Sequence, residues 1–452
     1  VLAFLPALDL VRFASGAWAM SSSAARVAKV HRRSVLGSTM GIPILLNCRR
    51  ATWPGSEDLA ENQAPLFGAA MLAFASGAPG DQQETHRSPP AEEFSEWYHG
   101  RRFVVVSGEY TARDFELNHM VRVFDRKLCR WVTPGPIDLA PEQAPSNGFG
   151  HHQGGVFGSC LYTFQWTGIH NDATVDLAHL HCVDLSTMFQ DVPAQRWRRW
   201  RIPRAEEHME NREAFSLAMC DGHIVVFGGT RTGKFWRTLA WLDVSSSSTG
   251  GMVPWDLLDP TISSSPAAAG PWPCGRACAT LTPLDAIEGQ GLPRNCIRLV
   301  LFGGVGLKRN EDEISRHVAV LHWSSKSWTI ARSSGQPHAG RVSCSAVAAG
   351  MNVLYFGGTR SANGRSCDHL SALDVRSWTW SQPRLQGTLP EARYASPMVL
   401  EGNCILVFGG LRCRRSTGTY SRDDYLGDMH EIRIELDLGS TDTDGSVQVN
   451  ME

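Results

Sequence analysis

One short pattern occurs four times in this chain: an apolar run that ends in a pair of glycines. The first copy reads Val225-Val226-Phe227-Gly228-Gly229, and the later copies end at Gly303-Gly304, Gly357-Gly358 and Gly409-Gly410. An apolar run of this length followed by two glycines is typical of a buried strand that leads into a sharp, close-packed turn. Four copies, about fifty to seventy-five residues apart, indicate a repeat architecture.

An arginine precedes each copy at a regular distance. It stands 15 residues before the last aromatic residue of the run in three copies, as Arg212, Arg341 and Arg393. In the remaining copy Arg276 lies 26 residues before Phe302, and the extra length falls in the loop 284–295. We interpret each arginine as the start of a strand that pairs antiparallel with the Gly-Gly strand.

The rest of each unit is also regular. A polar loop, a strand that ends in an Asp-containing turn and a tryptophan strand follow the glycines; in the fifth unit the last two are Leu370 to Val375 and Trp378 to Trp380. Two degenerate units without the glycine pair come first, from Phe103 to Trp131 and from Cys160 to Trp197 or Trp200. This gives six units, with seven as the alternative.

The order of strand, glycine pair, turn and tryptophan strand resembles kelch repeats, whose units fold as four-stranded blades of a β-propeller. The resemblance implies an all-β, kelch-type propeller over residues 101–438, with six blades, or seven as the alternative. It implies a structural role for the glycines, which let neighbouring blades pack closely. That role covers Gly228, Gly229, Gly303, Gly304, Gly357, Gly358, Gly409 and Gly410.

The last unit has no tryptophan strand after Met429 to Leu436, so another segment must close the ring. The candidates are Ile42 to Leu46, Leu66 to Phe74 and Ser446 to Val449; the remaining alternative is a chain truncated at this end. Residues 34–100 read as a proline-punctuated linker that holds a closing strand or a first-blade strand. Within it, Pro65 to Ala75 has the character of the inner strand of the first repeat. Residues 439–452 are expected to form an acidic, disordered tail.

The N-terminal residues 1–33 predict two short helices. The text Phe4-Leu5-Pro6-x-Leu8-Asp9-Leu10-Val11-Arg12-Phe13-Ala14, with Trp18 after it, resembles the later half of an F-box. That helical motif docks its family members onto the Skp adaptor of cullin-RING ubiquitin ligases, and its first part is absent here. The resemblance implies adaptor contacts by Leu5, Leu8, Leu10, Val11 and Phe13. The alternative is a generic amphipathic hairpin or a disordered leader.

Composition narrows the choice of partner and compartment. A formal net charge of -2 gives no global attraction to nucleic acid or to a membrane, and no run of eighteen apolar residues predicts a membrane span. The 12 cysteines form no CxxC pair, and Cys220, Cys296, Cys344 and Cys404 lie in or beside apolar strand text. We therefore expect reduced, buried thiols in a cytoplasmic or nuclear protein.

No catalytic pattern stands out. The chain has no phosphate-binding glycine loop followed by a helix, no nucleophile elbow and no sialidase-type box. The histidines that a copper oxidase on a kelch propeller would need are confined to the second unit: His151, His152, His170, His179 and His181. We expect no enzyme activity, no cofactor and no bound metal, with a metal oxidase as the minor alternative.

Arginines, in contrast, recur on the loops that follow the glycine pairs. With the strand-leading arginines they predict a basic rim at one mouth of the propeller, suited to a protein partner or an acidic or phosphorylated peptide. The predicted substrate-binding residues are Arg212, Arg231, Arg276, Arg341, Arg360, Arg393 and Arg412. In the alternative reading, the loop arginines are solvated charge and the strand-leading ones brace adjacent blades.

The leading hypothesis combines a function for the propeller with a function for the N-terminal leader. The propeller selects a substrate, and the F-box-like leader presents it to a ubiquitin ligase. The rival is a kelch scaffold with no ligase role.

Overall fold

The structure is a computed structural model of the chain. It describes residues 44–50, 66–67, 70–75, 102–107, 110–111, 122–125, 130–132, 137–138, 149–157, 160–167, 174–184, 195–196, 198–202, 212–231, 234–245, 254–259, 271–284, 297–308, 311–335, 340–360, 364–401, 404–413, 424 and 426–436. The predicted N-terminal helices (1–33) and the acidic tail (439–452) lie outside these residues. No helix in the described ranges is long and apolar enough to cross a membrane.

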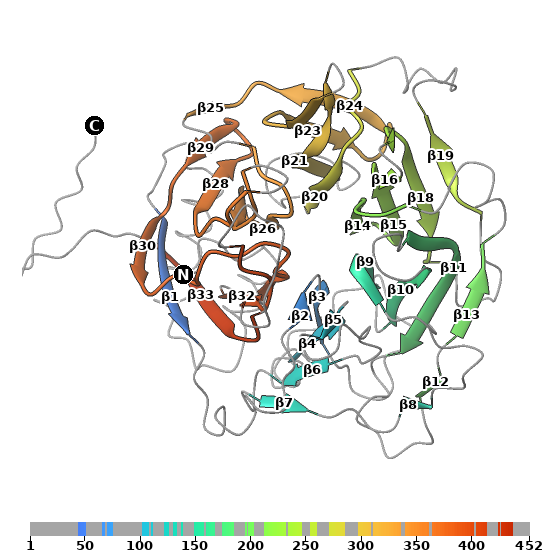
Figure 1. The fold of residues 1–452 in the computed structure, drawn as a ribbon, viewed down its shortest axis with the longest axis horizontal. Helices are drawn as coiled ribbons and strands as arrows, with labels where there is room; N and C mark the ends of the chain where they lie inside the picture. The colour runs from blue at the N-terminus through green and yellow to red at the C-terminus, as the bar shows by residue number, and fades with distance from the viewer. Residues whose placement is uncertain are drawn as a thin grey trace, which may run out of the picture.

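Six sheets of four or five strands form within the described residues, and Figure 1 shows them arranged around a common centre. We number them in chain order, each from its innermost strand outward. The first has β3 (Ala70–Ala75), β4 (Arg102–Ser107), β6 (Arg122–Asp125) and β7 (Arg130–Val132). The second has β9 (Phe149–Phe157), β10 (Cys160–Thr167), β11 (Thr174–Asp184) and β13 (Arg198–Arg201). The third has β14 (Ser216–Cys220), β15 (His223–Phe227), β18 (Leu239–Asp243) and β19 (Asp256–Leu258).

The last three sheets contain a fifth strand each. The fourth has β20 (Ala277–Leu284), β21 (Arg298–Lys308), β23 (Val318–His322) and β24 (Ser327–Ala331), with β22 (Glu311–Ile314) paired to β21. The fifth has β26 (Ser345–Ala349), β27 (Asn352–Phe356), β28 (Leu370–Asp374), β29 (Thr379–Ser381) and β25 (Ser334–Gly335). The sixth has β31 (Met398–Glu401), β32 (Cys404–Phe408), β33 (Met429–Leu436), β1 (Ile44–Arg50) and β30 (Arg384–Gly387).

Three short pairs complete the strands: β2 (Leu66–Phe67) with β5 (Tyr110–Thr111), β8 (Ile137–Asp138) with β12 (Gln195–Arg196), and β16 (Thr230–Arg231) with β17 (Lys234–Phe235). The expected all-β propeller is confirmed. Five of the six larger sheets are described with side chains, and the first by its strands alone.

The Gly-Gly strands are apolar on both faces because each face packs against a different neighbouring sheet. In β15, Ile224 and Val226 join a cluster with the second sheet, while Val225 and Phe227 join one with the fourth. Full burial of such side chains stabilises the fold by about 1.5–3 kcal/mol each. The tryptophan strands complete this packing: the ring of Trp328 lies 5.0 Å from Phe227 of the preceding sheet, and Trp380 lies 4.8 Å from Phe302.

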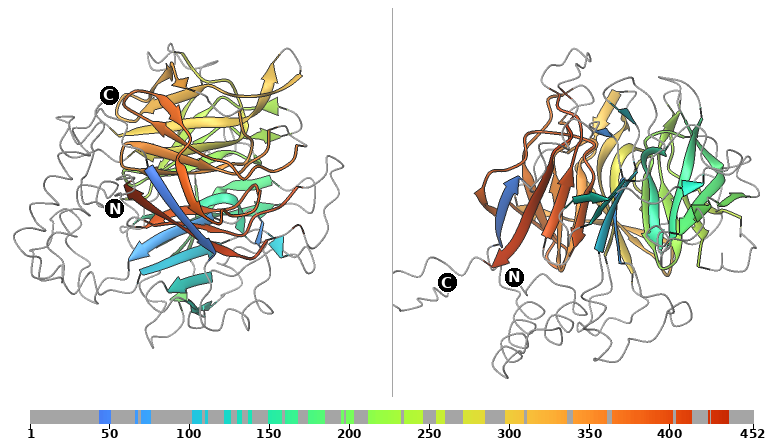
Figure 2. Two further views of the ribbon diagram at one scale, coloured as in Figure 1. Left: turned by 90° about the vertical axis from the view of Figure 1, so that its left-hand side faces the viewer. Right: turned by 90° about the horizontal axis from the view of Figure 1, so that it is seen from below.

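A strand from the N-terminal part of the chain closes the sixth sheet. β1 pairs antiparallel with β33, from Ile44 opposite Leu436 to Arg50 opposite His430. β30, which follows the fifth sheet, pairs parallel to the other edge of β1. Figures 1 and 2 show β1, in blue, alongside the red β33 at the outer side of the ring. Of the proposed closing segments, the one that begins near Ile42 occupies this position, while Ala70–Ala75 is the innermost strand of the first sheet.

Candidate functional site

The four strand-leading arginines are buried, which corrects the predicted rim. The exposed fractions are 0% for Arg212 and Arg393 and 2% for Arg276 and Arg341. Their side chains point into the sheets because backbone carbonyls there accept their hydrogen bonds. These four residues therefore do not form a solvent-facing binding surface.

Each of these guanidinium groups braces the first glycine of its own sheet. The Nη1 atom donates to the glycine carbonyl oxygen in every case: Arg212 to Gly228 at 3.0 Å, Arg276 to Gly303 at 3.1 Å, Arg341 to Gly357 at 3.1 Å and Arg393 to Gly409 at 2.9 Å. The hydrogen bond fixes the start of the inner strand against the end of the second strand. This contact explains the constant spacing between the arginine and the glycine pair in the sequence.

The main chain of the same arginines links neighbouring sheets. The second glycine donates its N–H to the carbonyl oxygen of the next sheet's arginine, as Gly229 to Arg276 (2.9 Å), Gly304 to Arg341 (2.7 Å) and Gly358 to Arg393 (2.9 Å). The first glycine lies against that same oxygen: a Cβ on Gly303, whose φ is 73°, would be 2.3 Å from the oxygen of Arg341. Only glycine fits this position.

A ring of backbone hydrogen bonds follows, two residues after each arginine. Ala214, Cys278, Ser343 and Ala395 all have φ between 50° and 55°. The N–H of each of the last three donates to the carbonyl oxygen of its counterpart in the preceding sheet: Cys278 to Ala214 at 2.7 Å, Ser343 to Cys278 at 3.0 Å and Ala395 to Ser343 at 2.9 Å. The sequence did not predict this ring, because alanine, cysteine and serine share no side-chain signature for a left-handed backbone.

Two of these residues, Cys278 and Ser343, also line a central cavity of about 570 Å³. Its walls are the innermost strands β9, β14, β20, β26 and β31 with the residues just before them, among them Ser216, Ser343 and Ser345. The hydroxyl of Ser216 donates to the carbonyl oxygen of Ala279 at 2.9 Å, and that of Ser345 donates to Ser396. Several polar groups of the wall are therefore used to join neighbouring sheets.

The loop arginines differ from the strand-leading ones. Arg231, Arg360 and Arg412 occupy the same place, two residues after the second glycine of the third, fifth and sixth sheets. Since corresponding strands of a propeller run in the same direction, the three lie at the same end of the ring. We call this end, with the glycine pairs and the loops after them, the Gly-Gly face.

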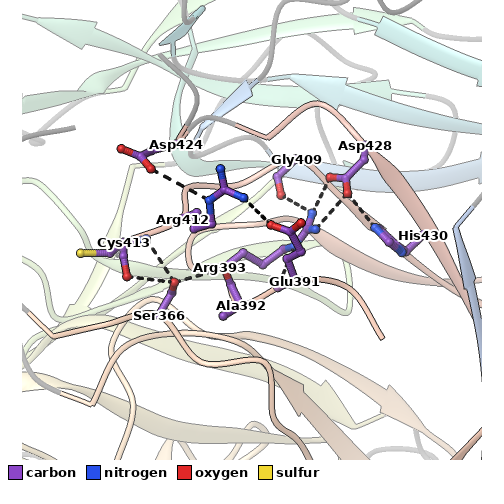
Figure 3. Close-up of polar contacts among 10 residues, drawn as sticks. All are labelled: Ser366, Glu391, Ala392, Arg393, Gly409, Arg412, Cys413, Asp424, Asp428 and His430. Carbon is purple, nitrogen blue, oxygen red and sulfur yellow. Dashed lines mark hydrogen bonds and ion pairs between the residues drawn. The ribbon is translucent and has the colours of Figure 1, made fainter. Parts of the chain in front are cut away.

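These three arginines differ in exposure to solvent and in ion pairing. Arg231 and Arg360 are exposed, and neither forms an ion pair within the described residues. Arg412 is 17% exposed; its Nη1 lies 2.5 Å from Oε2 of Glu391, and its Nε lies 4.0 Å from Oδ1 of Asp424 (Figure 3). Two of the predicted binding arginines thus face solvent, and the third is engaged by the chain's own carboxylates.

A second buried network lies beside Arg412 (Figure 3). Arg393 donates through Nη1 and Nη2 to the two oxygens of Asp428, at 2.7 and 3.1 Å, and His430 Nε2 lies 2.7 Å from Oδ2. Burial alone would raise the pKa of the Asp428 carboxyl, but the hydrogen bonds and charges of His430 and Arg393 hold it well below its usual range. Asp428 therefore stays ionised and neutralises this brace.

Arg276 and Arg341 show no carboxylate contact within the described residues. Arg276 donates to the carbonyl oxygens of Cys274 and Gly303, and burial lowers its pKa to about 10. Arg341 donates to the carbonyl oxygens of Gly357 and His369 and to the Ser371 hydroxyl. The fourth and fifth sheets consequently carry buried positive charge close to the Gly-Gly face.

Loops of the fifth and sixth sheets are joined on this face. The Ser366 hydroxyl donates to the carbonyl oxygen of Ala392 at 3.1 Å and accepts from the N–H of Cys413 at 3.1 Å (Figure 3). The N–H of Ser366 in turn donates to the carbonyl oxygen of Cys413 at 3.2 Å. The backbone around Arg360 and Arg412 is therefore held by neighbouring loops.

Other predicted features carry less information. The described residues include no group of three His, Cys, Asp or Glu side chains placed to hold a metal ion. Burial raises the pKa of the Cys344 thiol, just before β26, to about 11. The predicted adaptor contacts Leu5, Leu8, Leu10, Val11 and Phe13 lie outside the described residues.

Comparison with known proteins supports the repeat assignment. The KLHDC2/KLHL20/DRC7 Kelch-repeats domain family matches residues 294–443, which hold the fourth, fifth and sixth glycine-pair units apart from the start of the fourth. The human Rab9 effector protein with kelch motifs is 31% identical over 116 residues, 25% of this chain and 30% of that protein. The Bos taurus protein of the same name is 31% identical over 113 residues, 25% of this chain and 29% of its own length.

Human host cell factor 2 is also similar, at 26% identity over 145 residues, 31% of this chain and 18% of that protein. The chain thus matches less than a third of the length of each of these relatives. The repeats within residues 294–443 match a kelch-repeat family, and the similarity does not extend to the whole of any of these proteins.

Proposed function

We propose that this kelch-repeat propeller is a protein-binding module whose Gly-Gly face holds an acidic segment of its partner. The observation that carries the proposal is the pair of exposed arginines, Arg231 and Arg360, at equivalent positions on loops that a rigid ring supports. A guanidinium group can donate two parallel hydrogen bonds to a carboxylate or a phosphate. The buried charges of Arg276 and Arg341 add a positive potential to the same face.

Several features support a role in recognition rather than catalysis. The buried arginines donate their hydrogen bonds to carbonyl oxygens of the chain itself and so brace the sheets. The relatives with kelch motifs include one whose name describes an effector of Rab9, and we carry over from it only the binding of a protein partner. We take the ring as six-bladed in this proposal, supported by the six larger sheets of the described residues.

The test is a binding measurement with a fluorescein-labelled peptide of glutamate and glycine. Replacing Arg231 and Arg360 together with alanine should weaken binding about tenfold or more, since both charge-assisted contacts are lost. Arg433→Ala removes an exposed arginine midway along β33 and serves as the matched control. Equal affinity of the double variant and the native protein, with both folded, would contradict the proposal.

A role in a ubiquitin ligase is a more specific proposal, and it rests on the sequence of residues 4–14. This F-box-like segment would recruit the Skp adaptor through Leu5, Leu8, Leu10, Val11 and Phe13, while the propeller holds the substrate. Co-purification of the full-length protein with the Skp adaptor would support this role. Loss of the adaptor from the Leu8→Ala, Leu10→Ala variant is the expected result, and an adaptor that never co-purifies leaves a kelch scaffold as the function.

A further inference from the structure

The carboxylate of Glu391 occupies the place that a partner's carboxylate would take on Arg412. Glu391 stands two residues before the strand-leading Arg393, whose Nε donates to the Glu391 carbonyl oxygen at 3.0 Å. The brace therefore also positions Glu391. Its side chain is 62% exposed, whereas Arg412 is 17% exposed. The ion pair lies at the surface, where another carboxylate can reach it.

The fifth sheet lacks this carboxylate. Its loop arginine is Arg360, and in the sequence the residue two positions before the strand-leading Arg341 is Ala339, which lies outside the described residues. A methyl group cannot engage a guanidinium, and Arg360 is exposed. In the fourth sheet the same two positions hold Cys274 and Gly306, so that sheet has no arginine to engage.

We infer that Glu391, two positions before the strand-leading Arg393, withholds Arg412 of the same sheet from a partner, with Asp424 as a second and more distant carboxylate on Arg412. The inference rests on the proposed function for its biological meaning, since it names which arginines of the Gly-Gly face recognise the acidic segment. It makes Glu391 a specificity-determining residue that sets the number of anion contacts.

The size of the effect follows from the type of ion pair. Exposed ion pairs are weak, so Glu391 restrains Arg412 without locking it. Freeing Arg412 should raise the affinity for an acidic peptide about threefold to tenfold, the range expected for one added charge-assisted contact at a surface. A carboxylate introduced to pair with Arg360 should lower the affinity for the peptide by a similar factor.

Two reciprocal variants test the inference. Glu391→Ala removes the nearer carboxylate from Arg412 and leaves Asp424 in place, and Ala339→Glu adds a glutamate at the corresponding sequence position before Arg341. The first readout needs no partner: phenylglyoxal labelling of arginines, followed by mass spectrometry of the peptides. We expect faster labelling of Arg412 in Glu391→Ala and slower labelling of Arg360 in Ala339→Glu, with unchanged thermal midpoints.

The second readout is affinity for the labelled glutamate–glycine peptide. Arg412→Ala should have little effect in the native protein but should abolish the gain in the Glu391→Ala background. Asp368→Ala removes an exposed carboxylate from the loop before β28 and controls for net charge. Equal gains from Asp368→Ala and Glu391→Ala that both disappear at raised salt would overturn the inference, because only long-range charge would then be at work.

The two readouts separate the two claims. Unchanged labelling of both arginines overturns the inference even if the peptide binds. Changed labelling with no peptide binding by any variant supports the role of Glu391 and overturns the acidic-segment proposal. Glu210 stands at the same position before Arg212 and lies outside the described residues. Unchanged labelling of Arg231 in Glu210→Ala is expected if Arg231 is available, and faster labelling would remove Arg231 from the proposed binding residues.

Discussion

The strand-leading arginines account for much of the regular spacing between the repeats of this protein. Each strand-leading arginine fills a buried position and donates to the first glycine of its own sheet. The carbonyl oxygens of Arg276, Arg341 and Arg393 also accept from the second glycine of the preceding sheet. The cost of removing a guanidinium from water is offset by hydrogen bonds to oxygens that would otherwise be unpaired. The role of the arginine here depends more on the several N–H donors of its planar guanidinium group than on its charge.

Arg341→Ala tests the bracing role. The change leaves the carbonyl oxygens of Gly357 and His369 and the Ser371 hydroxyl without their donor, so we expect a loss of about 3 kcal/mol in the free energy of unfolding. Arg360→Ala, a loop arginine of the same sheet, should change it by less than about 0.5 kcal/mol. Urea denaturation followed by tryptophan fluorescence measures both. Similar losses in the two variants would contradict the distinction between brace and loop arginines.

Asp428 should make the stability of the sixth sheet dependent on acid pH. Its pKa is held below the usual range in the folded protein, so its contribution is fully present above the unfolded pKa, about 4. It is lost progressively as the pH falls below that value. Asp428→Asn should be less stable than the native protein at pH 7, and the difference should shrink towards pH 2. A difference that does not change with pH would show that the carboxylate charge is not the cause.

At the scale of elements, the sequence predicted most of what the backbone requires. Runs such as Val225 to Phe227 must be buried on both faces, and the glycine pairs must allow a positive φ, so both were readable. The burial of Arg212 could not be predicted from the sequence, because an arginine at the start of a strand is equally compatible with exposure to solvent and with burial among backbone carbonyl groups. Glu391 was missed as well, since its partner Arg412 is 21 residues away.

The closing strand β1 allows a test at this scale. Removal of residues 1–43 should leave the thermal midpoint of the propeller unchanged, because β1 is retained. Removal of residues 1–51 deletes β1, leaves β33 and β30 without their common partner, and should lower the midpoint by several degrees. Differential scanning calorimetry of both truncations gives the comparison. Equal midpoints would mean that β1 does not close the ring.

Across the whole molecule, the buried arginines have a structural role, and the exposed arginines on the loops are accessible to a partner. Buried arginines and glycine pairs join the sheets, and the loops beyond them present Arg231 and Arg360 at one end. Turns such as Asp221–Gly222 and 323–326 lie at the other end, where Lys326 packs over the ring of Trp323 at 3.3 Å. The account therefore assigns recognition to one face of the propeller.

Hydrogen–deuterium exchange of the protein with and without the glutamate–glycine peptide tests this assignment most directly. The account predicts that bound peptide slows exchange in residues 230–237 and 357–369, on the Gly-Gly face. Exchange in residues 221–223 and 323–326 should stay the same. Protection at 221–223 and 323–326 with none at 230–237 or 357–369 would contradict it.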